Sequence, residues 1–149
     1  MYMSTKTYGH NLGLSCAFRQ WRAESHCRYL HGYALQVEII FESKTLDFRN
    51  WVVDFGSMKE LRKSIENTFD HKTVIAEDDP MLDWFKNAHL NSILDLVILP
   101  GVGCEKFAEH IFYLAKEWLD KNRKNPDTTV VSVEVREHGA NSGIYLGDY

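Results

Sequence analysis

Strict alternation of apolar and polar residues over positions 33–42 constrains this 149-residue chain more than any other feature. One side of the segment is apolar throughout, and the other side is polar apart from Ala34 and Ile40. The apolar side consists of Tyr33, Leu35, Val37, Ile39 and Phe41. Because the side chains of a strand point alternately to opposite faces, this period of two predicts a half-buried antiparallel strand.

Three further segments are typical of strands. Residues 8–18 alternate in the same way and predict a first strand. Residues 131–137 predict a third strand, in which a row of three valines ends at Glu137 on the core side. Residues 143–149 predict a short final strand.

Helical patterns fill the middle of the chain. Ser57 and Glu60 have the spacing of a capping box, and apolar residues then recur at helical intervals, which predicts a helix ending near position 69. A longer amphipathic helix is predicted over about residues 104–122. The stretch 81–88 between them is short and ambiguous.

The predicted element order is therefore ββααββ, in a single domain of residues 1–149. This order predicts an α+β fold, with one four-stranded antiparallel sheet and two helices packed on one of its faces. The other face of such a sheet stays uncovered within one subunit. Oligomerisation is one way to cover it.

Composition excludes several classes of function. The net charge of −4 provides no basic field for binding nucleic acid. The longest apolar runs are a handful of residues, far short of the ~20 that span a bilayer, so no membrane insertion is expected. Three cysteines without close pairing, and no signal-peptide pattern at Met1, predict reduced thiols and a cytoplasmic location.

Chemically active side chains gather at the ends of the predicted elements. Each has a structural interpretation by itself: a buried thiol, a helix cap, a partner for a helix dipole, or a strand leaving the core. Together they indicate a site, because sites are commonly built where the elements of a rigid scaffold end. These side chains are Cys27, His31, the pair Asp70 and His71, Glu105 and Glu137.

The order and spacing of these residues resemble the 6-pyruvoyl- and 6-carboxy-tetrahydropterin synthase family over about the whole chain. The matching pattern is Cys27 with His31-Gly32, then Val52-Val53-Asp54-Phe55 leading to Lys59, then Asp70-His71, Glu105 and Glu137. The resemblance implies a tunnelling fold, in which ββααββ subunits pool their sheets into a barrel, usually as a homohexamer. It also implies pockets between subunits that hold a pterin-type substrate.

The same resemblance implies a lyase acting on a 7,8-dihydropterin triphosphate, in a pathway such as queuosine or biopterin synthesis. Cys27 matches the base that moves protons on the substrate side chain, and Asp70 with His71 matches the complementary relay. Glu137 matches the carboxylate that anchors the amino-pyrimidine edge, and Glu105 matches a further substrate-binding position. A carboxylate suits that edge because it accepts two parallel hydrogen bonds.

Zinc is the cofactor that the resemblance implies, held by three histidines. His31 keeps one of these positions, while Phe18 and Tyr33 occupy the other two. A catalytic zinc normally has three protein ligands, and a lone histidine does not hold it firmly. His10 and His26 are the histidines that would have to rebuild the site.

The replaced ligand positions keep two other functions open. One is a metal-free pterin or purine binder without synthase activity, and the other is zinc-independent chemistry on a related heterocycle. Gly103 also departs from the family pattern, because threonine is more usual there and its pterin contact would be absent. Three arginines around the first loop either stay solvated or contact a phosphorylated substrate tail: Arg19, Arg22 and Arg28.

Overall fold

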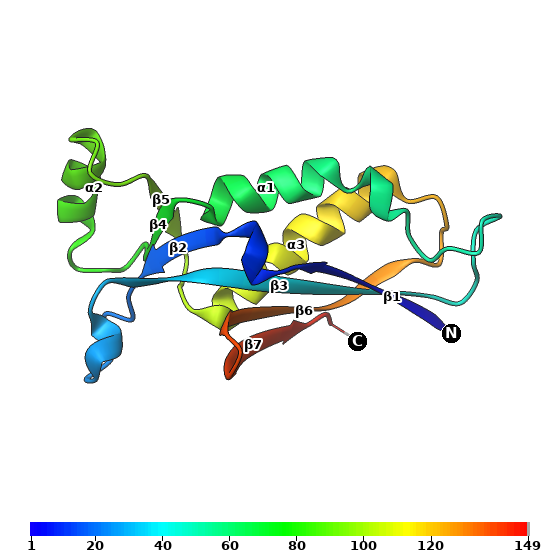
Figure 1. The fold of residues 1–149 in the computed structure, drawn as a ribbon, viewed down its shortest axis with the longest axis horizontal. Coiled ribbons are helices and arrows are strands. Elements are labelled where there is room, and N and C mark those ends of the chain that lie inside the picture. The colour runs from blue at the N-terminus through cyan, green and yellow to red at the C-terminus, as the bar shows by residue number, and fades with distance from the viewer. Residues whose placement is uncertain (149) are drawn as a thin grey trace.

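The computed structural model describes residues 1–148 and has one mixed sheet with helices stacked on one side of it (Figure 1). The strands are β1 (Tyr2–Tyr8), β2 (Leu14–Phe18), β3 (His31–Ser43), β4 (Lys72–Ala76), β5 (Leu96–Leu99), β6 (Thr129–His138) and β7 (Asn141–Leu146). The helices are α1 (Lys59–Phe69), α2 (Leu82–Leu90) and α3 (Cys104–Asn122), with 3-10 turns at His10–Leu12, His26–Arg28 and Phe55–Ser57.

The strand order is β5-β4-β2-β3-β6-β7, and β1 pairs with the second half of β3. The long strand β3 therefore joins two groups of strands, since it pairs with β2 over its first residues and with β1 over Val37–Ser43. The α+β class is confirmed, but the four-stranded antiparallel sheet is wrong. Seven strands are present in the described residues, and β4 pairs in parallel with both β2 and β5.

Two of the missed strands carry no alternation. Their apolar residues, 74–76 and 96–99, form runs too short to show a period, and the runs cannot be assigned to strands by pattern alone. The segment 8–18, predicted as one strand, contains the end of one strand and the whole of a second. A 3-10 turn interrupts it, so that Tyr8 ends β1 and Leu14 begins β2.

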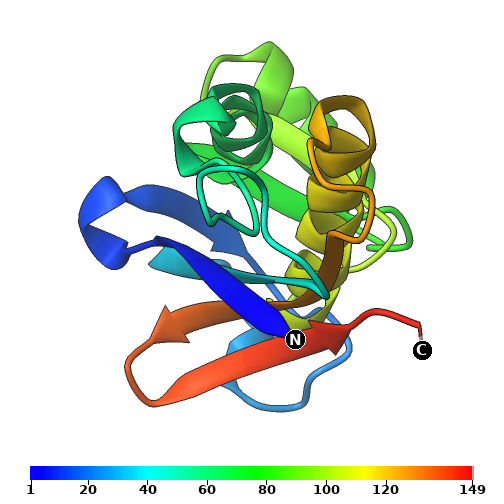
Figure 2. The ribbon, with the colours of Figure 1, turned by 90° about the vertical axis from the view of Figure 1, so that its right-hand side faces the viewer.

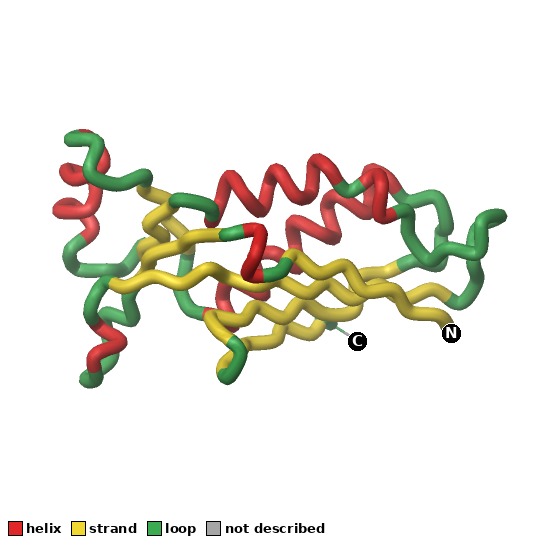
Figure 3. The backbone as a smooth tube through the Cα atoms, in the orientation of Figure 1, coloured by secondary structure: helices red, strands yellow, loops and turns green. Residues whose placement is uncertain are grey.

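Helices α1 and α3 lie side by side over the sheet, as the view along its length shows (Figure 2). The predicted apolar face of α3 is confirmed, because Phe107, Ala108, Ile111 and Ala115 are all fully buried. Helix α2 resolves the ambiguous stretch, and it lies beside β4 and β5 at one end of the molecule (Figure 3). Among residues 1–148, no helix has both the length and the apolar character needed to cross a membrane.

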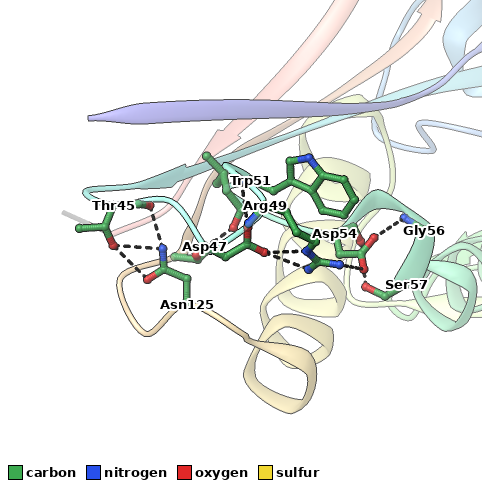
Figure 4. A network of polar contacts seen from close by, with 10 residues as sticks. Thr45, Asp47, Arg49, Trp51, Asp54, Gly56, Ser57 and Asn125 are labelled. Atoms are coloured by element: carbon green, nitrogen blue, oxygen red, sulfur yellow. Dashed lines mark hydrogen bonds and ion pairs between the residues drawn. The ribbon is translucent and has the colours of Figure 1, made fainter.

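The connection from β3 to α1 is held by a polar network (Figure 4). The Arg49 guanidinium bridges the carboxylates of Asp47 and Asp54, and the second Asp54 oxygen accepts the N–H of Gly56 at 2.9 Å. The Ser57 hydroxyl donates to the Asp54 carbonyl at 2.8 Å. The predicted capping box is therefore wrong: Ser57 lies in the 3-10 turn, and α1 begins at Lys59 without a side-chain cap.

The last two strands form a hairpin that differs from prediction in detail. A bulge opposite Ile40 and Phe41 takes Val131 out of the inward row, so that Val133 and Val135 are its fully buried members. Strand β7 begins two residues earlier than predicted and ends at Leu146. The predicted strand extended to Tyr149, which lies outside the described residues.

Candidate functional site

A hollow of about 220 Å³ lies where β2 ends, β3 begins and α3 starts. Four of the six predicted site residues line it, namely Cys27, His31, Glu105 and Glu137. The remaining wall is formed by Phe18, Gln20, Tyr33, Gly103, Cys104, Asn141 and Ser142. The pocket therefore combines the Cys27 thiol, an imidazole, a phenol and two carboxylates from four separate segments.

Cys27 is half-buried and belongs to the 3-10 turn that precedes β3. Ser25 caps this turn, since its side-chain oxygen accepts the N–H of Cys27 at 3.3 Å. The Cys27 carbonyl in turn accepts the N–H of Gln20 at 2.9 Å. The first bond closes the turn on itself, and the second fastens the turn to the segment that follows β2.

His31 and Tyr33 extend from the same face of β3, as predicted, with ring centroids 5.3 Å apart. The Nδ1 of His31 donates to the carbonyl of Tyr29 at 2.7 Å, which leaves Nε2 as the acceptor nitrogen of a neutral ring. Burial raises the pKa of the Tyr33 phenol, and the charges of Glu137 and Cys27 raise it further. The phenol therefore carries its proton at neutral pH.

Glu137 lies at a second bulge of β6, between the paired residues Arg136 and His138. Bulges redirect side chains, and this one turns the carboxylate into the pocket at the end of the buried valine row. Its Oε1 accepts the side-chain N–H of Asn141 at 3.1 Å. The turn of the β6–β7 hairpin thus orients the carboxylate.

Glu105 is in the first turn of α3, as predicted, and its exposed side chain lines the pocket. The helix start comes close to β7 because of Gly143, where an added Cβ would lie 2.5 Å from the Glu105 nitrogen. Any side chain at Gly143 would push α3 away from the hairpin. The glycine therefore brings Glu105 and Glu137 to the same hollow.

Gly103 precedes α3 with a φ of 109°, a conformation that favours glycine over the threonine more usual in the family. An added Cβ would also lie 2.5 Å from the Nε2 atom of Gln20. The Gln20 amide thus fills the space above Gly103, and it donates to the carbonyl of Val102 at 2.8 Å.

Asp70 and His71 are not in this pocket. They follow α1, with His71 in the left-handed region at a φ of 58° and its side chain 83% exposed. The Nδ1 of His71 lies 2.8 Å from Oδ1 of Asp70, and the backbone N–H of Ser15 also donates to that oxygen at 3.3 Å. The pair is oriented as a hydrogen-bonded unit, but toward the outside of this chain.

A larger hollow of about 410 Å³ lies beside the network of Figure 4 and carries little chemistry. Its one carboxylate, Asp54, is already engaged by Arg49 and Gly56. Its walls are otherwise mainly apolar and aromatic, including Trp51 and Phe55. The Asp54 part of the sequence pattern is therefore structural in this chain.

Arg19 and Asp79 link the end of β2 to the loop before α2. Two guanidinium nitrogens of Arg19 donate to the Asp79 carboxylate at 2.8 and 2.6 Å, and the Asp79 side chain is 1% exposed. Burial by itself would raise the pKa of Asp79, but hydrogen bonds from Arg19 and the Met81 N–H outweigh it, and the pKa is lowered. Arg22 forms an exposed pair with Asp78 instead.

Replacing Arg19 with methionine is expected to lower the free energy of unfolding by about 2–3 kcal/mol, because the Asp79 carboxylate then stays buried without its cation. The Asp79 pKa is lower in the folded state, so its stabilisation is present above about pH 4 and is lost as the pH falls through the folded value. Urea unfolding at pH 7 and pH 3 measures both effects. Arg22→Met is the exposed control, expected within about 0.5 kcal/mol of wild type. Equal losses for both variants would contradict the role of the Arg19 pair.

Sequence reasoning missed Gln20, Cys104, Asn141 and Ser142 as pocket residues. Asn141 and Ser142 begin β7, directly after the turn that follows Glu137, and such polar residues beside a candidate site residue were a signal in the sequence. No sequence signal pointed to Gln20 or Cys104, because only the packing of the segment after β2 against the start of α3 places them in the pocket. Burial raises the pKa of the Cys104 thiol to about 11, so it stays protonated.

Comparison with known proteins identifies the family. The family model described as 6-pyruvoyl tetrahydropterin synthase matches residues 10–148, nearly the whole chain. The chain belongs to the 6-pyruvoyl tetrahydropterin synthase family. The family resemblance inferred from the motif order is thereby confirmed.

Relatives and structures agree with this family. The 6-carboxy-5,6,7,8-tetrahydropterin synthase of Aquifex aeolicus is 25% identical over 136 residues, covering 89% of this chain and 83% of that protein. The enzyme of the same name from Rickettsia bellii is 37% identical over 57 residues, but the match spans only 41% of its length and 38% of this chain.

Solved structures show the same fold. An uncharacterized protein from Wolinella succinogenes superposes with a TM-score of 0.83 at 19% identity, covering 99% of this chain and 98% of that one. A Plasmodium vivax 6-pyruvoyltetrahydropterin synthase variant superposes with a TM-score of 0.70 at 16% identity and full coverage of both chains. At these identities the likeness concerns the fold of the 6-pyruvoyl tetrahydropterin synthase family.

Proposed function

We propose that this chain is a lyase of the tetrahydropterin synthase type, which binds a pterin and acts on a 7,8-dihydropterin triphosphate by acid–base chemistry. The observation that carries the proposal is a single pocket containing Cys27, His31 and two carboxylates. Membership of the family and relatives named 6-carboxy-5,6,7,8-tetrahydropterin synthase support it. Cys27 is the proposed base, and its thiolate form takes a proton from the substrate side chain.

Glu137 is the proposed anchor of the pterin ring. A carboxylate accepts two parallel hydrogen bonds from an N–H pair on one edge of a heterocycle. Its orientation by Asn141 supports this role, because one hydrogen bond to Oε1 still leaves acceptor capacity on both oxygens. Glu105 lines the same pocket and is the proposed second acceptor for the substrate.

We further propose that a second copy of the chain completes the site. Asp70 and His71 face outward, so their relay would act in the pocket of a neighbouring subunit of a homohexameric barrel. The pocket volume of about 220 Å³ supports this, since small-molecule sites commonly enclose ~300–1,000 Å³. Arg28 follows Cys27 in the chain, and its guanidinium lies 5.3 Å from the ring centroid of Tyr29. Arg28 is a candidate to bind the triphosphate tail of the substrate.

The decisive experiment is direct turnover. The purified protein is incubated with 7,8-dihydroneopterin triphosphate, and the release of triphosphate and the mass of the pterin product are followed. Release of triphosphate with formation of a tetrahydropterin supports the lyase. Binding of the pterin without turnover would instead establish the second candidate, a metal-free pterin or purine binder, which Phe18 and Tyr33 at the replaced positions favour.

Glu137→Gln is expected to weaken pterin binding about 10–100-fold, because the amide replaces an acceptor by a donor and a charge-assisted hydrogen bond contributes ~1.5–3 kcal/mol. Pterin fluorescence titration measures the dissociation constant. Glu134→Gln is the matched control on the same strand, since Glu134 pairs with Arg136 and does not line the pocket. An unchanged affinity in Glu137→Gln would reject the anchor role.

A further inference from the structure

Three aromatic side chains converge at the base of the pocket. Phe18 at the end of β2 is paired in register with His31 at the start of β3, and Tyr33 follows on the same face. The ring centroids of Phe18 lie 6.0 Å from His31 and 6.1 Å from Tyr33, and those of His31 and Tyr33 are 5.3 Å apart. These are the three positions at which the resemblance implies zinc-binding histidines.

The side chains present do not fit zinc. Phe18 has no lone pair, and its ring is 4% exposed with an edge-on contact to Phe107 at 5.0 Å, so it is a core residue. His31 offers Nε2 alone, because its Nδ1 donates to the Tyr29 carbonyl. Within residues 1–148, no three side chains of His, Cys, Asp or Glu are grouped closely enough to hold a metal ion. A catalytic zinc uses three protein ligands, and this pocket supplies one histidine.

The two other histidines considered as zinc ligands do not line the pocket. The Nδ1 of His10 contacts the carbonyl of Ala34, and His10 is not among the pocket residues. His26 belongs to the 3-10 turn but does not line the pocket either. The difference from the family is therefore a replacement of the ligand set, with Tyr33 bringing a hydroxyl to the same wall as Cys27.

We propose that the pocket works without zinc, and that the Tyr33 hydroxyl donates a hydrogen bond to the oxygen of the substrate side chain on which Cys27 acts. The phenolic O–H is a donor, and both residues line the same hollow. Edge-on contact with His31 and a tilted contact with His138 at 6.0 Å hold the Tyr33 ring in place. A donor fixed beside the base stabilises negative charge that develops on the oxygen as the proton leaves. The catalytic half of this inference rests on the proposed function.

Metal stoichiometry tests the first half without any assay of activity. Protein is incubated with excess zinc, desalted and analysed by mass spectrometry of the metal. Wild type is expected to retain well under one zinc per chain, and the double variant Phe18→His/Tyr33→His about one, because three imidazoles then converge. Zinc should also raise the melting temperature of the double variant alone. One zinc per chain in wild type, bound through the pocket and lost in His31→Ala, would overturn the inference.

Tyr33→Phe tests the hydroxyl. Turnover is expected to fall about 10²–10³-fold with pterin affinity within about twofold of wild type, as for removal of one donor to a developing oxyanion. Turnover equal to wild type would reject the Tyr33 role and leave the lyase proposal intact. If wild type binds pterin without turnover, the lyase proposal and this role both fall, while the zinc measurement still decides the metal. Should the double variant not fold, Tyr33→His with its two imidazoles replaces it, with zinc retention above wild type expected.

Discussion

Replacing Cys27 with alanine is expected to lower turnover of 7,8-dihydroneopterin triphosphate by about 10²–10⁴-fold, the range that a general base contributes. Pterin binding should change little, since the thiol acts on the side chain while Glu137 holds the ring. The backbone of the turn should persist, because Gln20 and Ser25 bind main-chain atoms of residue 27 and not its side chain. Turnover and fluorescence titration on the same preparations separate the two effects.

Cys16→Ala is the matched control for Cys27→Ala. Cys16 lies on the core side of β2 and is 1% exposed, and burial raises the pKa of its thiol to about 12. Such a thiol is neutral and inaccessible, so its removal should leave turnover within about threefold of wild type while costing stability. Turnover in Cys27→Ala within tenfold of wild type would show that the base lies elsewhere. Equal losses in both variants would indicate a structural effect rather than catalysis.

Local patterns predicted the parts of the fold in which local sequence determines structure. The alternation over 33–42 survives, because the residues on one face of β3 are buried in the core and those on its other face are partly exposed. The bounds of α3 match because its apolar stripe is uninterrupted. Strands β4 and β5 were missed because their apolar runs, residues 74–76 and 96–99, are too short to show a period, although Ile98 on the edge strand β5 is 40% exposed.

The candidate site was predictable in content but not in arrangement. Residues at element ends identified Cys27, His31, Glu105 and Glu137 from sequence, and the structure brings them to one hollow. The position of Asp70 and His71 relative to this hollow depends on the direction of the turn after α1. The left-handed backbone conformation of His71 sets that direction. The role of Gln20 above Gly103 depends on contact between segments 82 residues apart, which no local pattern encodes.

Phe107→Ala is expected to lower the free energy of unfolding by about 3–5 kcal/mol, the usual loss for a fully buried aromatic side chain. Phe107 is 0% exposed, and its ring makes edge contacts with Phe18 and Phe69 at centroid distances of 5.0 Å each. Truncation removes both aromatic contacts and leaves a cavity between α3 and the sheet. Denaturant unfolding monitored by circular dichroism measures the loss. Phe48→Ala is the control, because Phe48 is 92% exposed and should change stability by at most about 0.5 kcal/mol.

The same cavity lies directly behind the pocket wall, so Phe107 links stability to binding. Phe18 lines the pocket, and its ring also packs against the ring of Phe107. Loss of that support should loosen Phe18 and weaken pterin binding even under conditions where Phe107→Ala is fully folded. Phe107→Leu refills most of the volume and should restore much of both properties, since volume-conserving swaps cost less. A destabilised Phe107→Ala protein with unchanged pterin affinity would show that the wall is held by β2 and β3 alone.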